Sequence, residues 1–345
     1  FRSCSGLTSI VIPNSVRAVG SFAFYSCSGL TAISISTNLT ELSDNVFSSC
    51  SKLTSVTIPN NVTNIGPSAL SWCSMLTNVV IASSVQSIGA SAFAWCSKLS
   101  MIEIPGSVIS IGQEAFSSCG SLTHIEIPES VKSIGEAAFV HCLNLTAFTV
   151  NPNNPSYMSR DDILFDKTMT TLVACPIKET GTYSIPGSVS AIGNNAFSEC
   201  RSLTAITLPS GVKSIGKDAF EACGALTSIN IPYGVTNIGE SAFEFCSQLP
   251  SVIIPDSVTS IGKSSFSNCG KLNGIDIPDS VTNIGDSAFS SCDGLTSVTI
   301  PGSVSTISDG MFFGCSKLAS VTILNGVEKI GGTAFLSCPS LTWIT

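Results

Sequence analysis

Hydrophobic and polar residues follow one order that recurs along the whole chain. In Leu53–Cys73, LTSVTIPNNVTNIGPSALSWC, the apolar Val56 and Ile58 alternate with polar residues. Alternation with a period of two predicts a strand that buries one face. Pro59 follows and ends that strand, because proline offers no N–H group to a neighbouring strand.

The rest of the segment predicts two tighter elements. Val62 and Ile65 are three positions apart, which favours a 3₁₀-like turn. Ala69, Leu70 and Cys73 follow at i, i+1 and i+4. This spacing puts their side chains on one face of a short helix. Each such segment therefore predicts a strand, a turn and a short helix, all with apolar inner faces.

The cysteines give the period of this pattern. Consecutive members of the series are 23 residues apart, except for one step of 58: Cys4, Cys27, Cys50, Cys73, Cys96, Cys119, Cys142, Cys200, Cys223, Cys246, Cys269, Cys292, Cys315 and Cys338. Only Cys175 lies outside the series. Self-similarity at a fixed period of this length is typical of a stack of repeats, in which each unit contacts only its neighbours.

Stacking would align equivalent side chains in rows. Neighbouring coils should lie ~4.8 Å apart, the spacing between paired strands. One such row consists of phenylalanines: Phe24, Phe47, Phe93, Phe116, Phe139, Phe197, Phe220, Phe243, Phe266, Phe289, Phe312 and Phe335. No single coil can bury its apolar face alone, so we expect one continuous core.

The frame L-x-x-I/V-x-I-P-x-x-V-x-x-I-G-x-x-A-F-x-x-C resembles the 23-residue leucine-rich repeat of the Treponema or BspA-like type. It fixes about ten positions per unit and covers essentially the whole chain. Departures are local: Ser36, Ala82 and Leu324 replace the proline, and Leu70 replaces the phenylalanine. The resemblance implies an α/β solenoid, a right-handed superhelix with a parallel sheet on its concave face. Its other faces would carry short 3₁₀ and α turns.

We expect a single solenoid over residues 1–345, with a first repeat block at 1–150 and a second at 186–345. The irregular repeat between them, 151–185, carries DILFD and TTLVA on either side of a Lys-Thr-Met turn, which predicts a hairpin insert. It is either a structural irregularity that still stacks or a dedicated binding loop.

Both ends lack a polar capping coil, because Phe1 is in register with Phe24 and Trp343 opens a new strand. We therefore expect one of two situations. Either these residues are a fragment of a longer array, which would include any targeting segment, or the open ends are covered by other copies that associate end to end.

Charge and composition exclude some partners. The net charge is −8 and charged residues make up 11% of the chain. Nucleic acids and anionic membranes are bound by clustered Lys and Arg, which the sequence lacks. No apolar run approaches the ~18 residues of a membrane span.

The repeated cysteine allows four interpretations. A zinc site needs paired cysteines at close spacing, and none occur. A residue repeated in every coil is not a catalytic nucleophile. The separation of stacked Cα atoms would permit disulfides between coils, but the Cβ vectors of stacked residues run parallel and do not converge. We favour a small buried hydrophobic residue that closes each predicted helix. No cofactor or metal is expected.

Strand side chains between the buried pairs should point outward and form the partner-binding surface. The residues we select there are Thr57, Glu103, His124, Glu126, Thr207, Asn230, Asp276, Thr299 and Thr322. Glu103 and Glu126 hold equivalent positions in adjacent coils, with His124 on the same face. Two carboxylates ~5 Å apart could serve acid–base chemistry or Ca²⁺ binding, but two solvated surface acids are the simpler interpretation.

By resemblance, the expected function is that of a non-enzymatic, cell-surface or secreted scaffold for adhesion or protein–protein interaction. The expected partner is a protein or another extracellular ligand. The alternative is a structural subunit of an extracellular fibre assembled end to end. A carbohydrate-active enzyme that uses Glu103 and Glu126 is the least favoured hypothesis.

Overall fold

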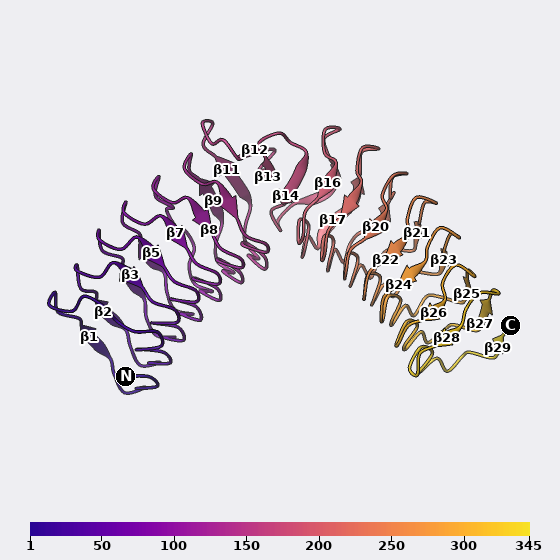
Figure 1. The fold of residues 1–345 in the computed structure, drawn as a ribbon, viewed down its shortest axis with the longest axis horizontal. Helices are drawn as coiled ribbons and strands as arrows, with labels where there is room; N and C mark the ends of the chain where they lie inside the picture. Colours follow the sequence, from indigo (N-terminus) through magenta and orange to yellow (C-terminus); the bar gives the residue numbers. More distant parts are fainter. The chain divides into compact units, whose positions relative to one another are not determined.

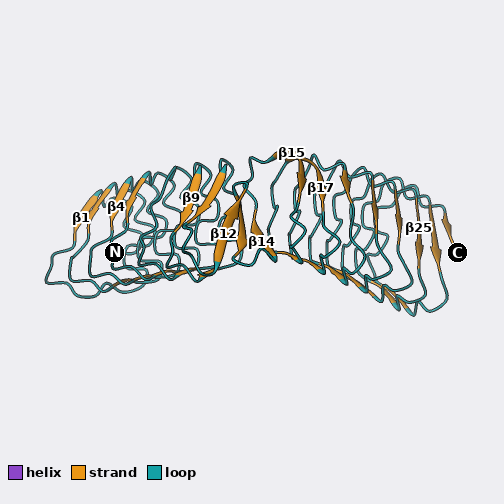
Figure 2. Ribbon diagram, turned by 90° about the horizontal axis from the view of Figure 1, so that it is seen from above, coloured by secondary structure: helices purple, strands orange, loops and turns teal.

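The computed structural model describes residues 1–345 and divides them into two compact units. Unit 1 comprises residues 1–167 and 176–178, and unit 2 comprises 168–175 and 179–345. Each unit is a stack of coils with two rows of parallel strands (Figures 1 and 2). The prediction of a parallel-strand solenoid is confirmed in each unit. That the repeat blocks form a single domain stays a prediction.

In unit 1, strands of neighbouring coils pair in parallel in two rows, of which the second is continuous and the first is divided into separate sheets. The first row holds the predicted strands: β1 (Ser9–Val11), β2 (Ala32–Ser34), β4 (Ser55–Thr57), β6 (Asn78–Val80), β9 (His124–Ile127) and β11 (Ala147–Val150). The second row holds two-residue strands: β3 (Glu41–Leu42), β5 (Asn64–Ile65), β7 (Ser87–Ile88), β8 (Ser110–Ile111) and β10 (Ser133–Ile134).

Unit 2 repeats this arrangement. Its first row is β15 (Thr180–Ser184), β17 (Ser202–Thr207), β19 (Ser228–Ile229), β21 (Ser251–Ile253), β23 (Gly274–Asp276), β25 (Ser297–Ile300), β27 (Ser320–Ile323) and β29 (Trp343–Ile344). Its second row is β14 (Thr171–Ala174), β16 (Ala191–Ile192), β18 (Ser214–Ile215), β20 (Asn237–Ile238), β22 (Ser260–Ile261), β24 (Asn283–Ile284), β26 (Thr306–Ile307) and β28 (Lys329–Ile330).

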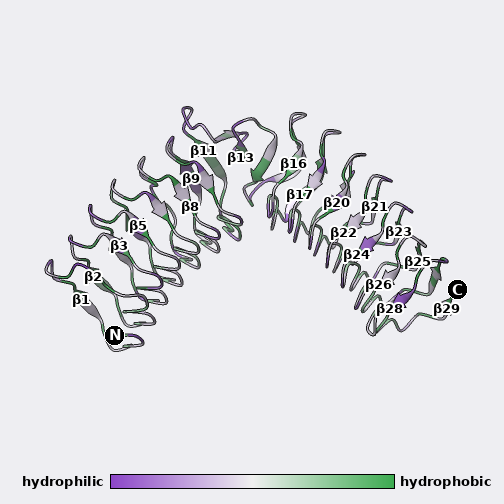
Figure 3. Ribbon diagram, viewed as in Figure 1, coloured by the Kyte–Doolittle hydropathy of each residue, from purple (hydrophilic) through white to green (hydrophobic).

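The strand register equals the sequence period. Val56 of β4 lies opposite Val79 of β6, and Ile65 of β5 lies opposite Ile88 of β7, each 23 residues on. Like residues therefore meet like residues, and every coil buries the same positions. Hydrophobic and hydrophilic stretches consequently recur from coil to coil (Figure 3).

The predicted 3₁₀ turn is wrong: the second row of strands replaces it. The N–H of Thr63 donates to Thr40 O at 2.9 Å, and that of Gly66 donates to Leu42 O at 2.7 Å. These donors bond the preceding coil and not their own, so the segment is extended. Val62 and Ile65 are both buried, but Val62 precedes β5 and Ile65 lies in it, which accounts for their spacing.

The predicted helix is also wrong, and no segment of the structure is helical (Figure 2). We call the segment from the glycine to the cysteine of each coil the turn row. In the second coil, Val46 N–H donates to Ser43 O three residues back, whereas Phe47 N–H donates to Ala69 O of the next coil. An α-helix needs consecutive N–H groups to bond carbonyls four residues back. Here every second N–H donates to a carbonyl of the next coil, so the segment forms linked β-turns and not a helix.

Most turn rows contain two residues with positive φ. Examples are Ser68 at 53° and Trp72 at 60°, which stand four residues apart. Each occupies the third position of a turn, where type II turns require positive φ. Serine, asparagine and aspartate hold many of these positions, although bulkier residues occur.

The irregular repeat contains an antiparallel hairpin that the sequence did not predict, and the hairpin predicted between DILFD and TTLVA stays a prediction. β12 (Tyr157–Arg160) pairs antiparallel with β13 (Ile163–Asp166) through Asp161 and Asp162, both with positive φ. The segments DILFD and TTLVA supply β13 and β14, one in each unit. Buried Asn154 anchors the repeat: its amide donates to Pro128 O and Val131 O, and its carbonyl accepts two backbone N–H groups.

Stacked phenylalanine rings form the centre of each unit. Ring centroids in unit 2 are 5.2–5.6 Å apart from Phe197 to Phe335, with planes within 13° of parallel. Unit 1 repeats this stack except at Leu70, which is fully buried between Phe47 and Phe93. No helix in the structure could cross a membrane.

The glycine at the start of most turn rows is required by close approach between coils. A Cβ atom on Gly112 would lie 2.5 Å from Ala90 N and 2.6 Å from Gly89 C. Its φ is not positive, so space and not backbone conformation selects glycine. Where Ser43 stands at this position, its hydroxyl instead donates to Val19 O at 2.6 Å.

We expect Gly112→Ala to destabilise the protein by about 1–3 kcal/mol, because the added methyl group forces two coils apart. The matched control is Gly106→Ala: a Cβ there meets nothing within 4 Å, and φ is not positive. The control should be neutral or stabilising by up to about 1 kcal/mol. Urea unfolding measures both variants, and equal effects would refute the packing explanation.

The repeated cysteines form no disulfides, and they make a hydrogen bond that the sequence did not predict. Cys269 Sγ donates to Phe243 O at 3.2 Å, and eleven other cysteines donate to the equivalent carbonyl of the preceding coil. Burial raises the pKa of Cys142 and Cys269 to about 12. The cysteine is thus a small buried residue, as expected, and also a donor between coils.

These pKa values predict a loss of stability at alkaline pH. In the unfolded chain the thiols ionise near their ordinary value of 9.0. Folding raises their pKa, so their contribution is complete below pH 9 and is lost as pH rises toward 12. Between pH 8 and pH 10, each buried thiol should lower the free energy of unfolding by about 1.4 kcal/mol.

A double variant tests this assignment. Cys142→Ser with Cys269→Ser retains a donor for each phenylalanine carbonyl but removes two titrating groups. Between pH 8 and pH 10, it should lose about 3 kcal/mol less unfolding free energy than the parent protein. An identical pH dependence in both proteins would contradict the prediction.

Candidate interaction surface

The predicted partner-binding residues lie on the outer side of the first strand row, which we call the strand face. Eight of the nine are exposed, and Thr322 is half-buried. They fall into two sets, because Thr57, Glu103, His124 and Glu126 belong to unit 1 and the other five to unit 2. Most are in strands, whereas Asn230 directly follows β19. Strand pairing makes Thr299 and Thr322 direct neighbours.

Glu103 and Glu126, the expected pair of carboxylates, are not on paired strands. Glu126 lies in β9 opposite Thr149 of β11, but no strand forms around Glu103. His124 contacts Thr149 instead: Nε2 and Oγ1 are 3.0 Å apart. No group of three or more His, Cys, Asp or Glu side chains in the chain is arranged to hold a metal ion. The structure therefore supports two exposed acids, one of them beside a His–Thr contact.

Threonine hydroxyls run along the edge of the strand face. Thr77 Oγ1 donates to Thr54 O at 3.1 Å, Thr146 Oγ1 donates to Thr123 O at 2.9 Å, and Thr227 Oγ1 donates to Thr204 O at 2.9 Å in unit 2. Each bond joins a hydroxyl to the carbonyl of the preceding coil. The hydroxyls are thereby fixed in direction, and their lone pairs remain available to accept hydrogen bonds from a partner.

The strand face also exposes aliphatic side chains. Met101 and Ile253 are each 73% exposed, and Val11 is equally open. The sequence shows these residues at outward positions, but their exposure depends on no other segment covering them. The face is thus a mixed surface of hydroxyls, single charges and aliphatic groups, without exposed aromatic rings in its central strands.

The aromatic side chains that are exposed lie mainly on the turn row. Trp72 and Trp95 of unit 1 stack with centroids 4.4 Å apart and planes within 7° of parallel. Both have positive φ and are about half exposed. Other coils of this unit carry Ser26, Ser49 or Ser118 at the same position. A large ring at a position that serine holds in most other coils of this unit is the sequence signal that our prediction overlooked.

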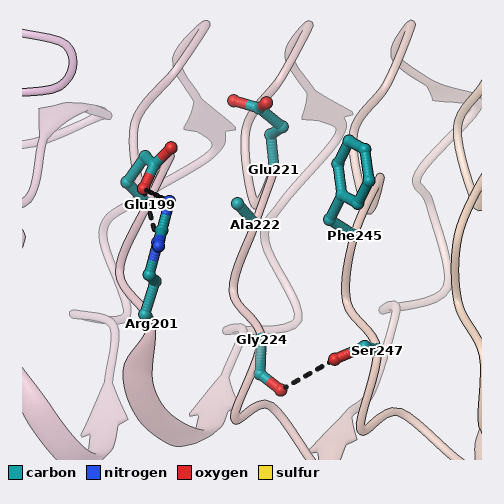
Figure 4. Close-up of a pocket in the computed structure, with 7 residues that line it drawn as sticks. All are labelled: Glu199, Arg201, Glu221, Ala222, Gly224, Phe245 and Ser247. Atoms are coloured by element: carbon teal, nitrogen blue, oxygen red, sulfur yellow. Dashed lines mark hydrogen bonds and ion pairs between the residues drawn. The ribbon is translucent and has the colours of Figure 1, made fainter.

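Unit 2 has a hollow of about 440 Å³ where its turn row ends, lined by Glu199, Arg201, Glu221, Ala222, Gly224, Phe245 and Ser247 (Figure 4). We call it the turn-row hollow. It arises because Ala222 and Gly224 are small, whereas the flanking coils carry an Arg–Glu pair and an aromatic ring. Arg201 and Glu199 form an ion pair, with Nε 2.6 Å from Oε2. None of these residues was selected from the sequence.

Comparisons with known proteins agree with this architecture. The model of the BspA-type leucine-rich repeat region matches residues 1–97, 63–180, 174–293 and 246–345. No curated protein matches. A leucine-rich repeat protein from Eubacterium ventriosum is 26% identical with a TM-score of 0.84, and the match covers 95% of this chain and 90% of that one.

Two other solved structures are similar. A leucine-rich cell surface protein from Faecalibacterium prausnitzii is 30% identical, with a TM-score of 0.61 over 98% of this chain and 78% of that one. A leucine-rich repeat protein from Bacteroides ovatus is 28% identical, with a TM-score of 0.55 over 100% of this chain and 80% of that one. The repeat architecture is therefore shared with bacterial proteins along nearly the full length of this chain.

Proposed function

The chain belongs to the family of BspA-type leucine-rich repeat proteins, and we propose that it is a non-enzymatic scaffold that binds a protein partner through its strand face. The observation that carries this proposal is the strand face itself. It repeats exposed side chains in fixed register over many coils, on a backbone whose hydrogen bonds are already made between coils. Such a surface binds without first having to order itself.

We further propose that the protein acts outside the cell or at its surface, in adhesion or in contacts with other extracellular proteins. The support is the similarity to a protein described as a cell surface protein and the acidic, charge-poor composition. The likeness covers most of both chains.

Lysine substitutions on the strand face of unit 2 should abolish partner binding without unfolding the protein. The variant carries Thr207, Asn230, Asp276 and Thr299, each changed to Lys. All four side chains are exposed, so the changes add bulk and charge outside the core. Binding to a panel of immobilised, purified extracellular proteins is measured by surface plasmon resonance, and folding by circular dichroism.

The matched control places lysines in the same coils on the second strand row, at Ser214, Asn237 and Asn283, and at Ser305 directly before β26; all four residues are also exposed. It should bind like the parent protein. Loss of binding in both variants would indicate a general charge effect, and full binding by the strand-face variant would refute the proposed surface.

The alternative function is that of a structural subunit in an extracellular fibre. Its support is that the coil-to-coil interface is self-complementary along the chain, so the same contacts could join separate copies. Sedimentation velocity over a wide concentration range distinguishes the two. A fibre subunit should form rods whose length grows with concentration, whereas a binding scaffold should remain of constant size.

A further inference from the structure

The turn-row hollow has the shape of a slot one coil wide. Its floor is the coil of Ala222 and Gly224, and its walls are the coils before and after it. The core phenylalanine rings of these three coils follow each other at 5.3 and 5.2 Å. In Figure 4, the Arg201–Glu199 pair and the Phe245 ring stand on opposite sides of the small residues. A flat group in the slot would therefore lie one coil step from each wall.

The wall residue Phe245 is not needed by the core. Its ring is 48% exposed, and its φ is 60°. Positive φ is unfavourable for a bulky residue, and other coils of unit 2 place Asn268, Ser291 or Gly314 at this position. An aromatic ring that is both exposed and conformationally costly is a candidate binding group.

The charges beside the slot favour a cation. Arg201 is paired with Glu199, and Lys217 is paired with Glu240 at 3.2 Å, so these four groups neutralise one another. Glu221 lines the hollow and lies close enough to Asp218 for their carboxylates to repel, and neither has such an ion pair. Ser198 Oγ donates to Glu221 Oε2 at 2.8 Å, which fixes that carboxylate and leaves Oε1 to accept.

We propose that the turn-row hollow of unit 2 binds an arginine side chain presented by a partner protein. A guanidinium is flat enough for a slot one coil wide, and at one coil step it lies within the ~6 Å over which a cation is attracted by an aromatic ring. Its forked N–H groups can donate to Glu221 Oε1 and to the second lone pair of Oε2, because arginine pairs with carboxylates in a planar, bidentate way. Lysine lacks both the flat shape and the fork.

This site lies on the turn row and not on the strand face, so it extends the proposed function to a second contact. The two proposals can fail separately. The four lysine substitutions on the strand face leave every residue of the hollow unchanged, and that variant should bind the arginine probe as the parent protein does.

The test uses three peptides that differ at one central residue, with glycine and serine around it: arginine, its uncharged isostere citrulline, or lysine. Binding to the full chain is measured by saturation-transfer NMR at low salt. The arginine peptide should bind about tenfold more tightly than the citrulline peptide, which lacks the charge, and several-fold more tightly than the lysine peptide. Added salt should weaken binding of the arginine peptide.

Two variants locate the site. Glu221→Gln removes the accepting charge, and Phe245→Ser introduces the residue found at the equivalent position 291. Each should weaken binding of the arginine peptide by about tenfold. The controls, Glu328→Gln and Phe313→Ser, change an exposed acid and an exposed ring outside the hollow and should leave binding unchanged.

The proposal would be overturned by equal binding of the arginine and citrulline peptides. It would also be overturned if Phe245→Ser bound the arginine peptide like the parent protein while circular dichroism showed both to be folded. Binding of a neutral maltooligosaccharide in the hollow, without binding of the arginine peptide, would assign the slot to a sugar ring and refute arginine as its occupant.

Discussion

Backbone hydrogen bonds between successive coils are the constraint on which the rest of this structure depends. In both strand rows, N–H groups donate to the coil 23 residues away, and in the turn row every second N–H does so. A coil cannot satisfy these groups within itself. The unit of stability is therefore the contact between neighbours, and each coil must keep the same length and register as the next.

The close contact between coils explains which side chains are repeated. Glycine is required where backbones approach too closely for a Cβ atom. Phenylalanine stacks at the centre, and cysteine supplies a small side chain whose thiol still donates to a carbonyl of the preceding coil. Serine and threonine hydroxyls make similar bonds to carbonyls along the outside. Polar atoms of side chains thus reinforce the same interface that the backbone creates.

Because the backbone is committed to neighbouring coils, functional differences are left to the outward side chains. The strand face offers hydroxyls, scattered charges and aliphatic groups over a long distance, which suits contact with an extended protein surface. The turn row offers fewer but larger features: the stacked pair of Trp72 and Trp95 and the hollow beside Phe245. The two surfaces suit different kinds of partner contact on one scaffold.

The sequence alone determined the period, the strand register, the buried ladders and the outward positions of the strand face. Each of these follows from a repeat that fixes which residues meet: Val56 must face Val79 once coils stack at a constant length. The sequence did not determine the form of the turns, because spacing of Ala69, Leu70 and Cys73 is compatible with a helix or with linked β-turns. Only the destination of each N–H, inside the coil or in the next coil, decides between them. The hollow beside Phe245 likewise depends on the tertiary structure, because it is formed by residues of three coils that become neighbours only when those coils stack.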